Sequence, residues 1–316
     1  MQGIKMKPFI KWAGGKTELL PVLEGNLPQQ IRENKEIDTY IEPFVGAGAF
    51  FIYLASNYKF NKIIINDVNH KLINVYRVIK ESYDELIKDL LCMREEYLSY
   101  SEEEKKEMYL RIRDEFNDWE NTNKIKQAAN FIFINKTCFN GLYRVNKNGE
   151  FNVPCGKYKN PTICDAKNLR NLSKLLQNVV FEYGDYKKCI KYIDTNTFVY
   201  FDPPYRPLSI TSGFTSYTKE DFNDENQKEL ADFYKELDLK NAKLMLSNSN
   251  PKNTNKEDNF FEDIYKGFNI NEVSAKRMIN SKAQGRGEIS ELLITNYKEN
   301  NECIQENSIL KMVVSN

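Results

Sequence analysis

The sequence has only one histidine, His70, among its 316 residues. A single imidazole cannot act at once as general base, proton donor and metal ligand, so histidine-based nucleophilic catalysis is not expected. No two cysteines form a Cys-x-x-Cys pair, which leaves no plausible zinc site, and we expect no metal. We expect reduced thiols of a cytoplasmic protein, rather than a disulfide framework, at Cys92, Cys138, Cys155, Cys164, Cys189 and Cys303.

Long apolar runs and an excess of one charge are also missing. No stretch approaches the roughly 20 apolar residues of a membrane-spanning helix, so we expect no membrane contact. Lys plus Arg and Asp plus Glu both number 45, so the total charge does not indicate a nucleic-acid partner. To bind nucleic acid, the protein would need a locally basic face. The 41% hydrophobic content fits one large folded domain, or a domain with a sizeable insertion.

The order of the predicted elements is that of an α/β protein with a doubly wound mixed sheet. Residues 39–44 predict a strand that ends in a glycine-rich turn, and residues 63–67 predict a short apolar strand that ends in an acid. The alternation resumes after about residue 165. Residues 268–273 and 292–297 predict a closing antiparallel pair.

An insertion interrupts this alternation. Residues 75–130 carry Glu, Lys, Arg and Leu at helical spacing and predict two or three helices that are mostly solvated. Residues 142–154 contain Asn-Gly between β-capable flanks, which is the strongest short-range signal for a hairpin. We therefore expect a catalytic domain, a target-recognition insertion and a C-terminal tail, with the ranges 1–75 plus 165–298, 76–164 and 299–316.

An acidic corner follows the apolar strand that is predicted at residues 198–201. Its residues are Asp202, Pro203, Pro204 and Tyr205. Asp202 can accept a hydrogen bond from an exocyclic amine and the Pro203 carbonyl can accept a second, while Tyr205 can stack on a flat ring. The prolines stiffen the turn. Taken alone, the tetrapeptide also fits a rigid strand-to-loop turn with a satisfied Asp and a core Tyr.

A second motif, Phe-x-Gly-x-Gly, places Phe44, Gly46 and Gly48 after an earlier strand. The glycines allow a tight turn and a close approach to a ligand, but the third glycine of a dinucleotide fingerprint is missing. A smaller ligand with an adenosine and an amino-acid tail suits the motif better. Asp67, about 20 residues further on, is either a ribose ligand or a helix cap. Lys16 lies in a Gly-Gly-Lys turn that lacks the spacing of a Walker A motif. Its side chain either neutralises a carboxylate or is solvated.

In this order, the glycine motif, the insertion and the Asp-Pro-Pro-Tyr motif resemble the alpha group of DNA N6-adenine methyltransferases. Segments 11–16, 139–144, 151–154 and 156–159 resemble its Dam branch (D12 class), whose members modify adenine in GATC. Within this branch the chain is most similar to the methyltransferase of the DpnII restriction–modification system. The resemblance covers about residues 8–297. It leaves open whether a restriction endonuclease accompanies the enzyme.

The resemblance implies a Rossmann-like fold that binds S-adenosylmethionine as methyl donor and double-stranded DNA as substrate. It assigns the catalytic motif to Asp202, Pro203 and Tyr205. It assigns donor binding to Trp12, Lys16, Asp67 and Asp202, above a turn formed by Phe44, Gly46 and Gly48. It assigns the DNA-reading surface to Lys11, Phe139, Asn140, Leu142, Arg144, Pro154 and Tyr158. Tyr143, beside the reading Arg144, is given no role.

The chemistry of these side chains agrees with that assignment. An adenine inside a duplex must be flipped out to reach a donor at the sheet edge, at a cost of a few kcal/mol, and stacking on Tyr205 would offset about 1–3 kcal/mol. Arg144 can grip a guanine edge, which is worth about 1–3 kcal/mol of discrimination. Methylation of cytosine N4, RNA or protein glutamine remains an alternative, although such motifs more often begin with Ser or Asn. A non-catalytic DNA-binding subunit is another.

Overall fold

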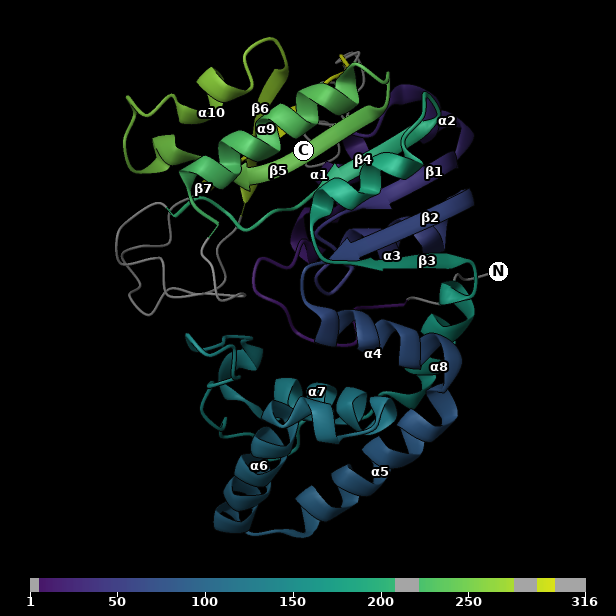
Figure 1. The fold of residues 1–316 in the computed structure, drawn as a ribbon, viewed down its shortest axis with the longest axis vertical. Coiled ribbons are helices and arrows are strands. Elements are labelled where there is room, and N and C mark those ends of the chain that lie inside the picture. Colours follow the sequence, from purple (N-terminus) through teal and green to yellow (C-terminus); the bar gives the residue numbers. More distant parts are fainter. Residues whose placement is uncertain (1–5, 208–221, 276–288, 299–316) are drawn as a thin grey trace, which may run out of the picture.

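The computed structural model describes residues 6–207, 222–275 and 289–298. These residues form a seven-stranded sheet with the order β3-β2-β1-β4-β5-β7-β6 (Figure 1). The parallel strands are β1 (Glu36–Glu42), β2 (Lys59–Asp67), β3 (Val179–Tyr183), β4 (Thr197–Phe201) and β5 (Lys243–Ser249). The antiparallel pair is β6 (Asn269–Ala275) and β7 (Ile289–Thr295), with β7 next to β5.

The predicted doubly wound mixed sheet is confirmed by this order. Strand β1 pairs with β2 on one side and with β4 on the other, so the direction of the strand order reverses between β1 and β4. In open α/β sheets, ligands bind beyond the carboxyl ends of the strands at such a switch point. The loops that follow β1 and β4 are therefore the expected place for a site.

Each face of the sheet has its own apolar core, because side chains alternate along a strand. On one face Val199 and Phe201 pack with α9 (Asp224–Asp238). On the other face Phe198 and Tyr200 pack with α3 (Ala49–Asn57). The remaining short helices of this sheet part are η1 (Thr17–Leu19), α1 (Leu20–Gly25), α2 (Gln29–Asn34), η4 (Tyr186–Tyr192), η6 (Pro251–Asn253) and α10 (Phe260–Ile264).

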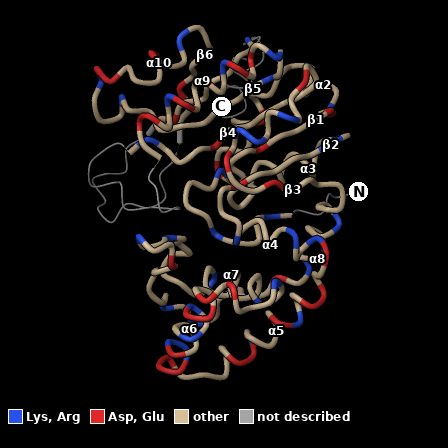
Figure 2. The backbone as a smooth tube through the Cα atoms, viewed as in Figure 1, with Lys and Arg blue, Asp and Glu red and all other residues tan. Residues whose placement is uncertain are grey.

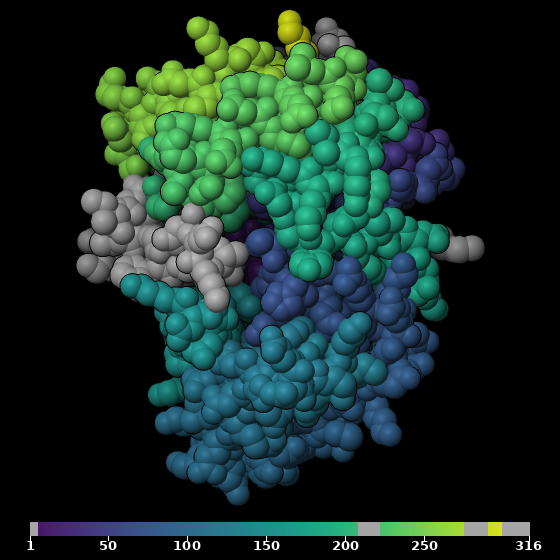
Figure 3. Space-filling model, in the orientation of Figure 1, coloured from purple at the N-terminus to yellow at the C-terminus, as the bar shows by residue number. Residues whose placement is uncertain are grey.

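A helical part extends the core on the α3 face away from the sheet. Figure 1 shows α4 nearest to the sheet and α5 and α6 furthest from it, and Figure 3 shows the helical part as a blue and teal mass below the green sheet part. Its elements are α4 (His70–Glu81), α5 (Tyr83–Ser99), α6 (Glu102–Asn117), η2 (Trp119–Asn121), α7 (Lys124–Thr137), η3 (Phe139–Gly141) and α8 (Ala166–Leu176).

The prediction that the inserted helices are mostly solvated was wrong for α7. This helix contacts α4, α5 and α6, and its residues from Gln127 to Asn135 are all buried. A helix that is apolar all round is a core helix, which the run from Ala128 to Ile134 shows in the sequence. The helical part thus shares one core with the α3 face of the sheet, to which α4 and α8 connect it. The expected boundary between residues 75 and 76 lies inside α4.

The predicted hairpin is a chain reversal with little regular strand. Val145 and Phe151 form an isolated antiparallel bridge, and the Asn146 carbonyl accepts a hydrogen bond from the Gly149 N–H at 2.8 Å. Gly149 has a φ of +83°, which favours glycine at this turn. Figure 1 shows these teal loops on the side of the molecule toward which β2 points.

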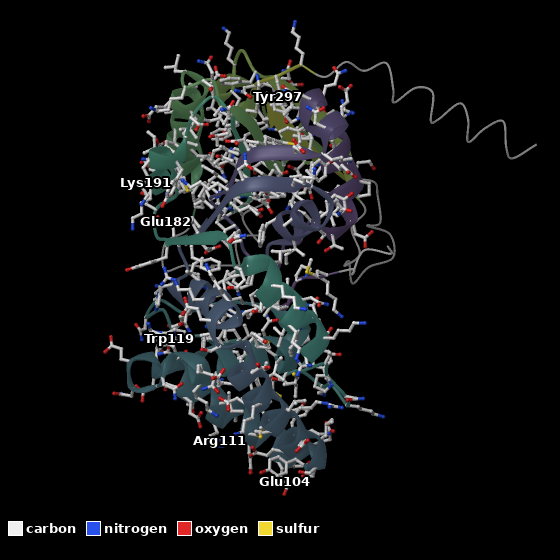
Figure 4. All side chains as sticks on the ribbon, turned by 90° about the vertical axis from the view of Figure 1, so that its right-hand side faces the viewer. Glu104, Arg111, Trp119, Glu182, Lys191 and Tyr297 are labelled. Carbon is white, nitrogen blue, oxygen red and sulfur yellow. The ribbon has the colours of Figure 1, made fainter. Side chains whose placement is uncertain are left out.

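The first turn of α6 is acidic, whereas the hairpin loops carry exposed lysines. Glu102, Glu103 and Glu104 occupy the first turn of α6, at the end furthest from the sheet (Figure 2). Figure 4 shows Glu104 and Arg111 at this far end and Trp119 nearer to the sheet. The hairpin loops carry Lys147, Lys157 and Lys159, all exposed. The acidic end therefore lies away from the loops that are expected to read DNA.

Other expectations concern cysteines, membranes and the tail. The five cysteines in the described ranges, Cys92, Cys138, Cys155, Cys164 and Cys189, are free thiols. None of the described helices combines the length and apolar character needed to cross a membrane. In the same part of the chain, no group of three or more His, Cys, Asp and Glu side chains is placed to hold a metal ion. Cys303 and the expected tail, 299–316, lie outside the described residues.

Candidate active site and DNA-reading surface

The acidic corner contains a buried ion pair between Lys16 and Asp202. The Lys16 Nζ lies 2.9 Å from Asp202 Oδ1 and donates a hydrogen bond of 2.6 Å to the Gly14 carbonyl. The same ammonium lies 4.5 Å from the ring centroid of Tyr205. Lys16 is only 4% exposed, so it is not a solvated lysine. The Gly-Gly-Lys turn thus brings its lysine to the end of β4, as the carboxylate-neutralising interpretation predicted.

Asp202 is an ionised acceptor at neutral pH. Burial raises the pKa of its carboxyl to about 6, Lys16 opposes that shift, and the charge of Glu291 adds to it. Because Lys16 pairs with Oδ1, the second carboxylate oxygen remains able to accept a hydrogen bond. A carboxylate that is held by one lysine and open on its other oxygen can receive an N–H donor.

Tyr205 is held from the far edge of the corner by Glu291 of β7. The tyrosine hydroxyl donates a hydrogen bond of 2.5 Å to Glu291 Oε2. Burial raises the pKa of this phenol well above its usual value, with Asp202 and Glu291 adding to the shift. Tyr205 therefore stays protonated. Lys16 contacts its ring and Glu291 holds its hydroxyl. Glu291 carries no motif in the sequence, since it lies in an ordinary apolar strand.

Amide side chains fix the backbone of the corner. Gln227 of α9 donates from Nε2 to the Pro204 carbonyl at 2.9 Å and accepts from Asn248 Nδ2 at 3.1 Å. Asn248 also accepts from the Arg206 N–H at 3.2 Å. In the part of the chain that the structure describes, the Pro203 carbonyl accepts no hydrogen bond and can serve a ligand. Sequence reasoning missed Gln227 and Asn248, because lone amides in a helix and a strand carry no signal.

Arg206 anchors the chain directly after the corner. Its guanidinium binds both carboxylate oxygens of Asp224, at 2.7 and 3.0 Å, and Asp258 Oδ2 at 2.7 Å. The guanidinium also lies 4.3 Å from the ring centroid of Phe260. Such a bidentate pair with stacking is specific to arginine. It fixes the far side of the Asp-Pro-Pro-Tyr turn to α9 and to the loop before α10.

The glycine turn after β1 is bound to Asp67. The Gly46 N–H donates to Asp67 Oδ2 at 3.0 Å, and the Asn69 N–H donates to Oδ1 at 2.9 Å. Each carboxylate oxygen keeps a free lone pair for a ligand. Burial raises the pKa of Asp67 to about 6, and these two hydrogen bonds oppose that shift. The cap of α4 is Asn69, whose side chain accepts from Lys71 and Leu72, so the capping alternative for Asp67 is not realised.

The turn itself requires its glycines. Gly46 and Gly48 have φ values of +48° and +69°, in the left-handed region. A Cβ at Gly46 would lie 2.9 Å from the Trp12 indole, and one at Gly48 would lie 2.6 Å from the Tyr76 hydroxyl. The Trp12 ring therefore lies directly on the turn. Phe44 packs on Tyr186, with ring centroids 5.2 Å apart.

Glu42 is a buried acid that sequence reasoning missed. It ends β1, is 3% exposed, and accepts a hydrogen bond of 2.6 Å from the Tyr40 hydroxyl. Burial raises its pKa to about 8, the tyrosine opposes that shift, and the charge of Asp202 adds to it. Burial and the nearby charge of Asp202 thus both favour the protonated form of Glu42. An acid inside an apolar strand was the available signal in the sequence.

The structure gathers most of the predicted reading residues at the loops between α7 and α8. Phe139 is 51% exposed, and its N–H donates to the Pro154 carbonyl at 2.9 Å. Asn140 beside it is exposed, with a φ of +56°. The Lys11 ammonium lies 5.0 Å from the Tyr158 ring centroid. An exposed aromatic ring, a proline and a lysine thus share one surface.

Arg144 is held in the hairpin by its opposite residue. Its Nε donates to Asn152 Oδ1 at 2.8 Å and its Nη2 donates to the Asn152 carbonyl at 3.3 Å. These bonds occupy one edge of the guanidinium and leave donors on Nη1 and Nη2. Leu142 on the same loop is half-buried against the core. The guanidinium is thus held in a defined direction before any ligand binds.

The doubly wound sheet, the glycine turn bound to an acid and the acidic Pro-Pro-Tyr corner define a Rossmann-like α/β protein with a candidate ligand site at the switch point of its sheet. Residues 12–279 match the family model for D12 class N6 adenine-specific DNA methyltransferases. The chain belongs to this family and is an adenine-specific DNA methyltransferase.

Three relatives show the range of the family. The chain is 54% identical over 296 residues to the Type II methyltransferase M.MjaIII of Methanocaldococcus jannaschii, covering 93% of this chain and 100% of the relative. It is 40% identical to the Type II methyltransferase M1.LlaDCHI of Lactococcus lactis subsp. cremoris, covering 93% and 96%. It is 34% identical to the DNA adenine methylase of Escherichia coli K12, covering 92% and 95%.

Proposed function

We propose that the protein transfers a methyl group from S-adenosylmethionine to N6 of an adenine flipped out of double-stranded GATC. The observation that carries this proposal is the Lys16–Asp202 pair beneath Tyr205, beside the turn of Gly46 and Asp67. It puts an open carboxylate oxygen and an aromatic ring next to a backbone cradle. The family gives the reaction, and the residue roles below are our own assignment.

The residues of the glycine turn fit S-adenosylmethionine. The turn has no room for a side chain, because a Cβ at Gly46 would meet Trp12 and one at Gly48 would meet Tyr76, so a ligand can approach its backbone closely. The free lone pairs of Asp67 suit ribose hydroxyls. Trp12 would close the cradle from above, with Phe44 beneath the turn. Lys16 and Asp202 would lie at its edge. When bound, the donor supplies a methyl group that its positively charged sulfur has already activated.

The corner then orients the target amine. Asp202 and the Pro203 carbonyl each accept a hydrogen bond from one N6–H group of the adenine. These two hydrogen bonds localise the lone pair of N6 and direct it toward the methyl group. Tyr205 holds the ring by stacking, and Glu291 fixes Tyr205. The nitrogen forms a bond to the methyl carbon as the carbon–sulfur bond breaks, and the surplus N6 proton passes to Asp202 and on to water. Most of the acceleration comes from this positioning.

The loops between α7 and α8 would bind DNA. Phe139 is placed to enter the space of the flipped base, and Asn140 lies beside it. Arg144 would grip a guanine edge in the major groove, and Leu142 or Pro154 would contact a thymine methyl. Lys11 and Tyr158 complete this surface. Exposed lysines on the loops, Lys147, Lys157 and Lys159, would meet phosphates.

The domain division and the partners are part of the proposal. The recognition insertion is proposed at residues 76–164, although α4 joins it to the sheet without a break. The higher identity to the two Type II methyltransferases than to the DNA adenine methylase favours a partner restriction endonuclease. We also propose a cytoplasmic location, which the free thiols of the described cysteines and the DNA substrate support.

One experiment tests the proposed site. Plasmid DNA exposed to the protein and S-adenosylmethionine is digested with nucleases that differ in their tolerance of methyl-adenine in GATC. We expect resistance only to the nuclease that methyl-adenine blocks, and no resistance with Asp202→Ala. Methylation by Asp202→Ala at the wild-type rate would overturn the mechanism. Methyl-adenine found outside GATC would overturn the proposed target sequence.

A further inference from the structure

Tyr143 lies buried between the reading loop and the glycine turn. It is 5% exposed, and its ring stacks on Trp12, with centroids 5.2 Å apart and planes at 28°. The Tyr143 ring also stacks on Phe131 of α7, with centroids 5.4 Å apart and planes at 15°. Its centroid lies 5.6 Å from that of Phe151. Stacked and tilted ring pairs at these distances are favourable contacts. Trp12 also stacks on Phe131, with centroids 6.4 Å apart, so Tyr143 belongs to a compact cluster of rings that includes Trp12.

This ring cluster reaches both sides of the proposed donor cradle. Trp12 lies directly on Gly46, as the 2.9 Å approach to a Cβ there shows. The Tyr143 hydroxyl lies beside the Asn69 side chain, while burial raises the pKa of this phenol to about 12. Asn69 in turn donates its N–H to Asp67. One side chain thus contacts the residues that flank the cradle on two sides.

The next residue in the chain is Arg144. Successive side chains of an extended segment point to opposite sides, and the Asn152 N–H that bonds to the Arg144 carbonyl keeps this segment extended beside Phe151. Tyr143 is buried, whereas the Arg144 guanidinium lies at the hairpin surface on Asn152. Any displacement of the backbone by a base held on Arg144 is therefore transmitted across one peptide to Tyr143.

We propose that Tyr143 is a positioning residue that couples the reading of the DNA sequence by Arg144 to the binding of the methyl donor beneath Trp12. The proposal rests on the function proposed above. The two binding events are then thermodynamically linked. If bound duplex changes the affinity of the protein for the donor, bound donor changes its affinity for duplex by the same factor. The ring cluster is close-packed, and it passes on small displacements because such packing is barely compressible. Losing the Tyr143 ring would break the linkage and leave each site in place.

The two tryptophans of the chain make this testable. Trp119 lies in the helical part against His70 and Phe116, so Trp119→Phe leaves Trp12 as the sole indole reporter. In this background, titration with cognate duplex, with a duplex of changed GATC, and with donor is followed by Trp12 fluorescence. Donor affinity is measured by equilibrium dialysis with and without duplex.

With Tyr143 intact, we expect cognate duplex to shift the Trp12 emission and to change donor affinity by about fivefold or more. Tyr143→Leu should reduce both effects to near zero, and Tyr143→Phe, which keeps the ring, should retain both. Phe133→Leu is the matched control, because it removes a fully buried ring of the same core that packs on Tyr97. It should keep the duplex effect even if it lowers stability.

The inference and the proposed function fail in different ways. If the parent methylates GATC but its donor affinity is the same with and without duplex, the coupling is refuted and the function stands. Retention of the full effect by Tyr143→Leu, or its loss in Phe133→Leu as well, would also refute the role of Tyr143. If the parent transfers no methyl group to duplex DNA, the proposed function itself is refuted.

Discussion

Lys16 and Asp202, which lie far apart in the sequence, form a buried ion pair with Nζ 2.9 Å from Oδ1. The pair joins the N-terminal Gly-Gly-Lys turn to the end of β4. It places a positive charge next to an acid that must stay ionised and leaves one oxygen of that acid open. Lys16 therefore sets the charge and the direction of the acceptor at once.

The first prediction concerns the two members of this pair. Asp202→Ala should abolish methylation, by about a hundredfold or more, because it removes the main acceptor for the target amine. It should also lower the free energy of unfolding by about 3–5 kcal/mol, because Lys16 stays buried without its partner. Methyl transfer and chemical denaturation measure these two losses separately.

The double variant Lys16→Met/Asp202→Leu separates the two effects. With both charges removed, the free energy of unfolding should return to within about 1–2 kcal/mol of the wild type, while methylation stays absent. A double variant as unstable as Asp202→Ala would show that the ion pair does not account for the loss of stability. Measurable transfer by it would show that the acid is not needed.

The second prediction is a pH profile. The reactive form of Asp202 is the carboxylate, and its pKa is raised to about 6, mainly by burial. Since kcat/KM for the target reports the free enzyme, it should be constant above about pH 7 and fall about tenfold per pH unit well below 6. The pH dependence of donor binding, measured alone, serves as control for Asp67. A flat profile down to pH 5 contradicts the assigned role.

A third prediction concerns the glycine turn. Gly46→Ala forces a Cβ to within 2.9 Å of Trp12 at a φ of +48°, so it should weaken donor binding and destabilise the fold by about 1–3 kcal/mol. Gly25→Ala is the control, because no atom lies within 4 Å of a Cβ there and Gly25 ends a helix. Equal donor affinity in both variants would argue against the cradle.

A fourth prediction separates base reading from phosphate binding. Arg144→Ala should cost about 1–3 kcal/mol on the cognate site and much less on a site with a changed guanine, which relaxes discrimination. Lys147→Ala, at the exposed tip of the same hairpin, should weaken binding to all sequences alike and lower the salt slope by about one. Competition binding at several salt concentrations gives both quantities. Uniform weakening by both variants would remove the reading role of Arg144.

The fold could be predicted well from the sequence because its signals are local. Local patterns predicted where three strands end. These patterns are the apolar run before Asp202, the glycine turn after β1 and the acid at the end of β2. The position of β7 between β5 and β6 is a long-range pairing, and only the existence of the pair was predicted. The burial of α7 was missed although its apolar run from Ala128 to Ile134 is visible in the sequence, because its contacts with α4, α5 and α6 arise only in the tertiary fold.

The site could be predicted only where motifs mark it. Asp202 and Gly46 stand in recognisable patterns, whereas Glu291 and Gln227 are ordinary residues that reach the corner through tertiary packing. Tyr143 illustrates the same limit: the sequence shows an aromatic beside Arg144, but only the structure shows that its ring stacks on Trp12. Contacts between distant segments have no local signature.

The most direct test of the account is mass spectrometry of nucleosides from a GATC duplex incubated with the protein and isotopically labelled S-adenosylmethionine. The account predicts that the label appears in N6-methyl-2′-deoxyadenosine, at one adenine in each strand of each GATC site. It predicts no label with Asp202→Ala. Label in a cytosine, or no label in duplex DNA while the donor is bound, would contradict it.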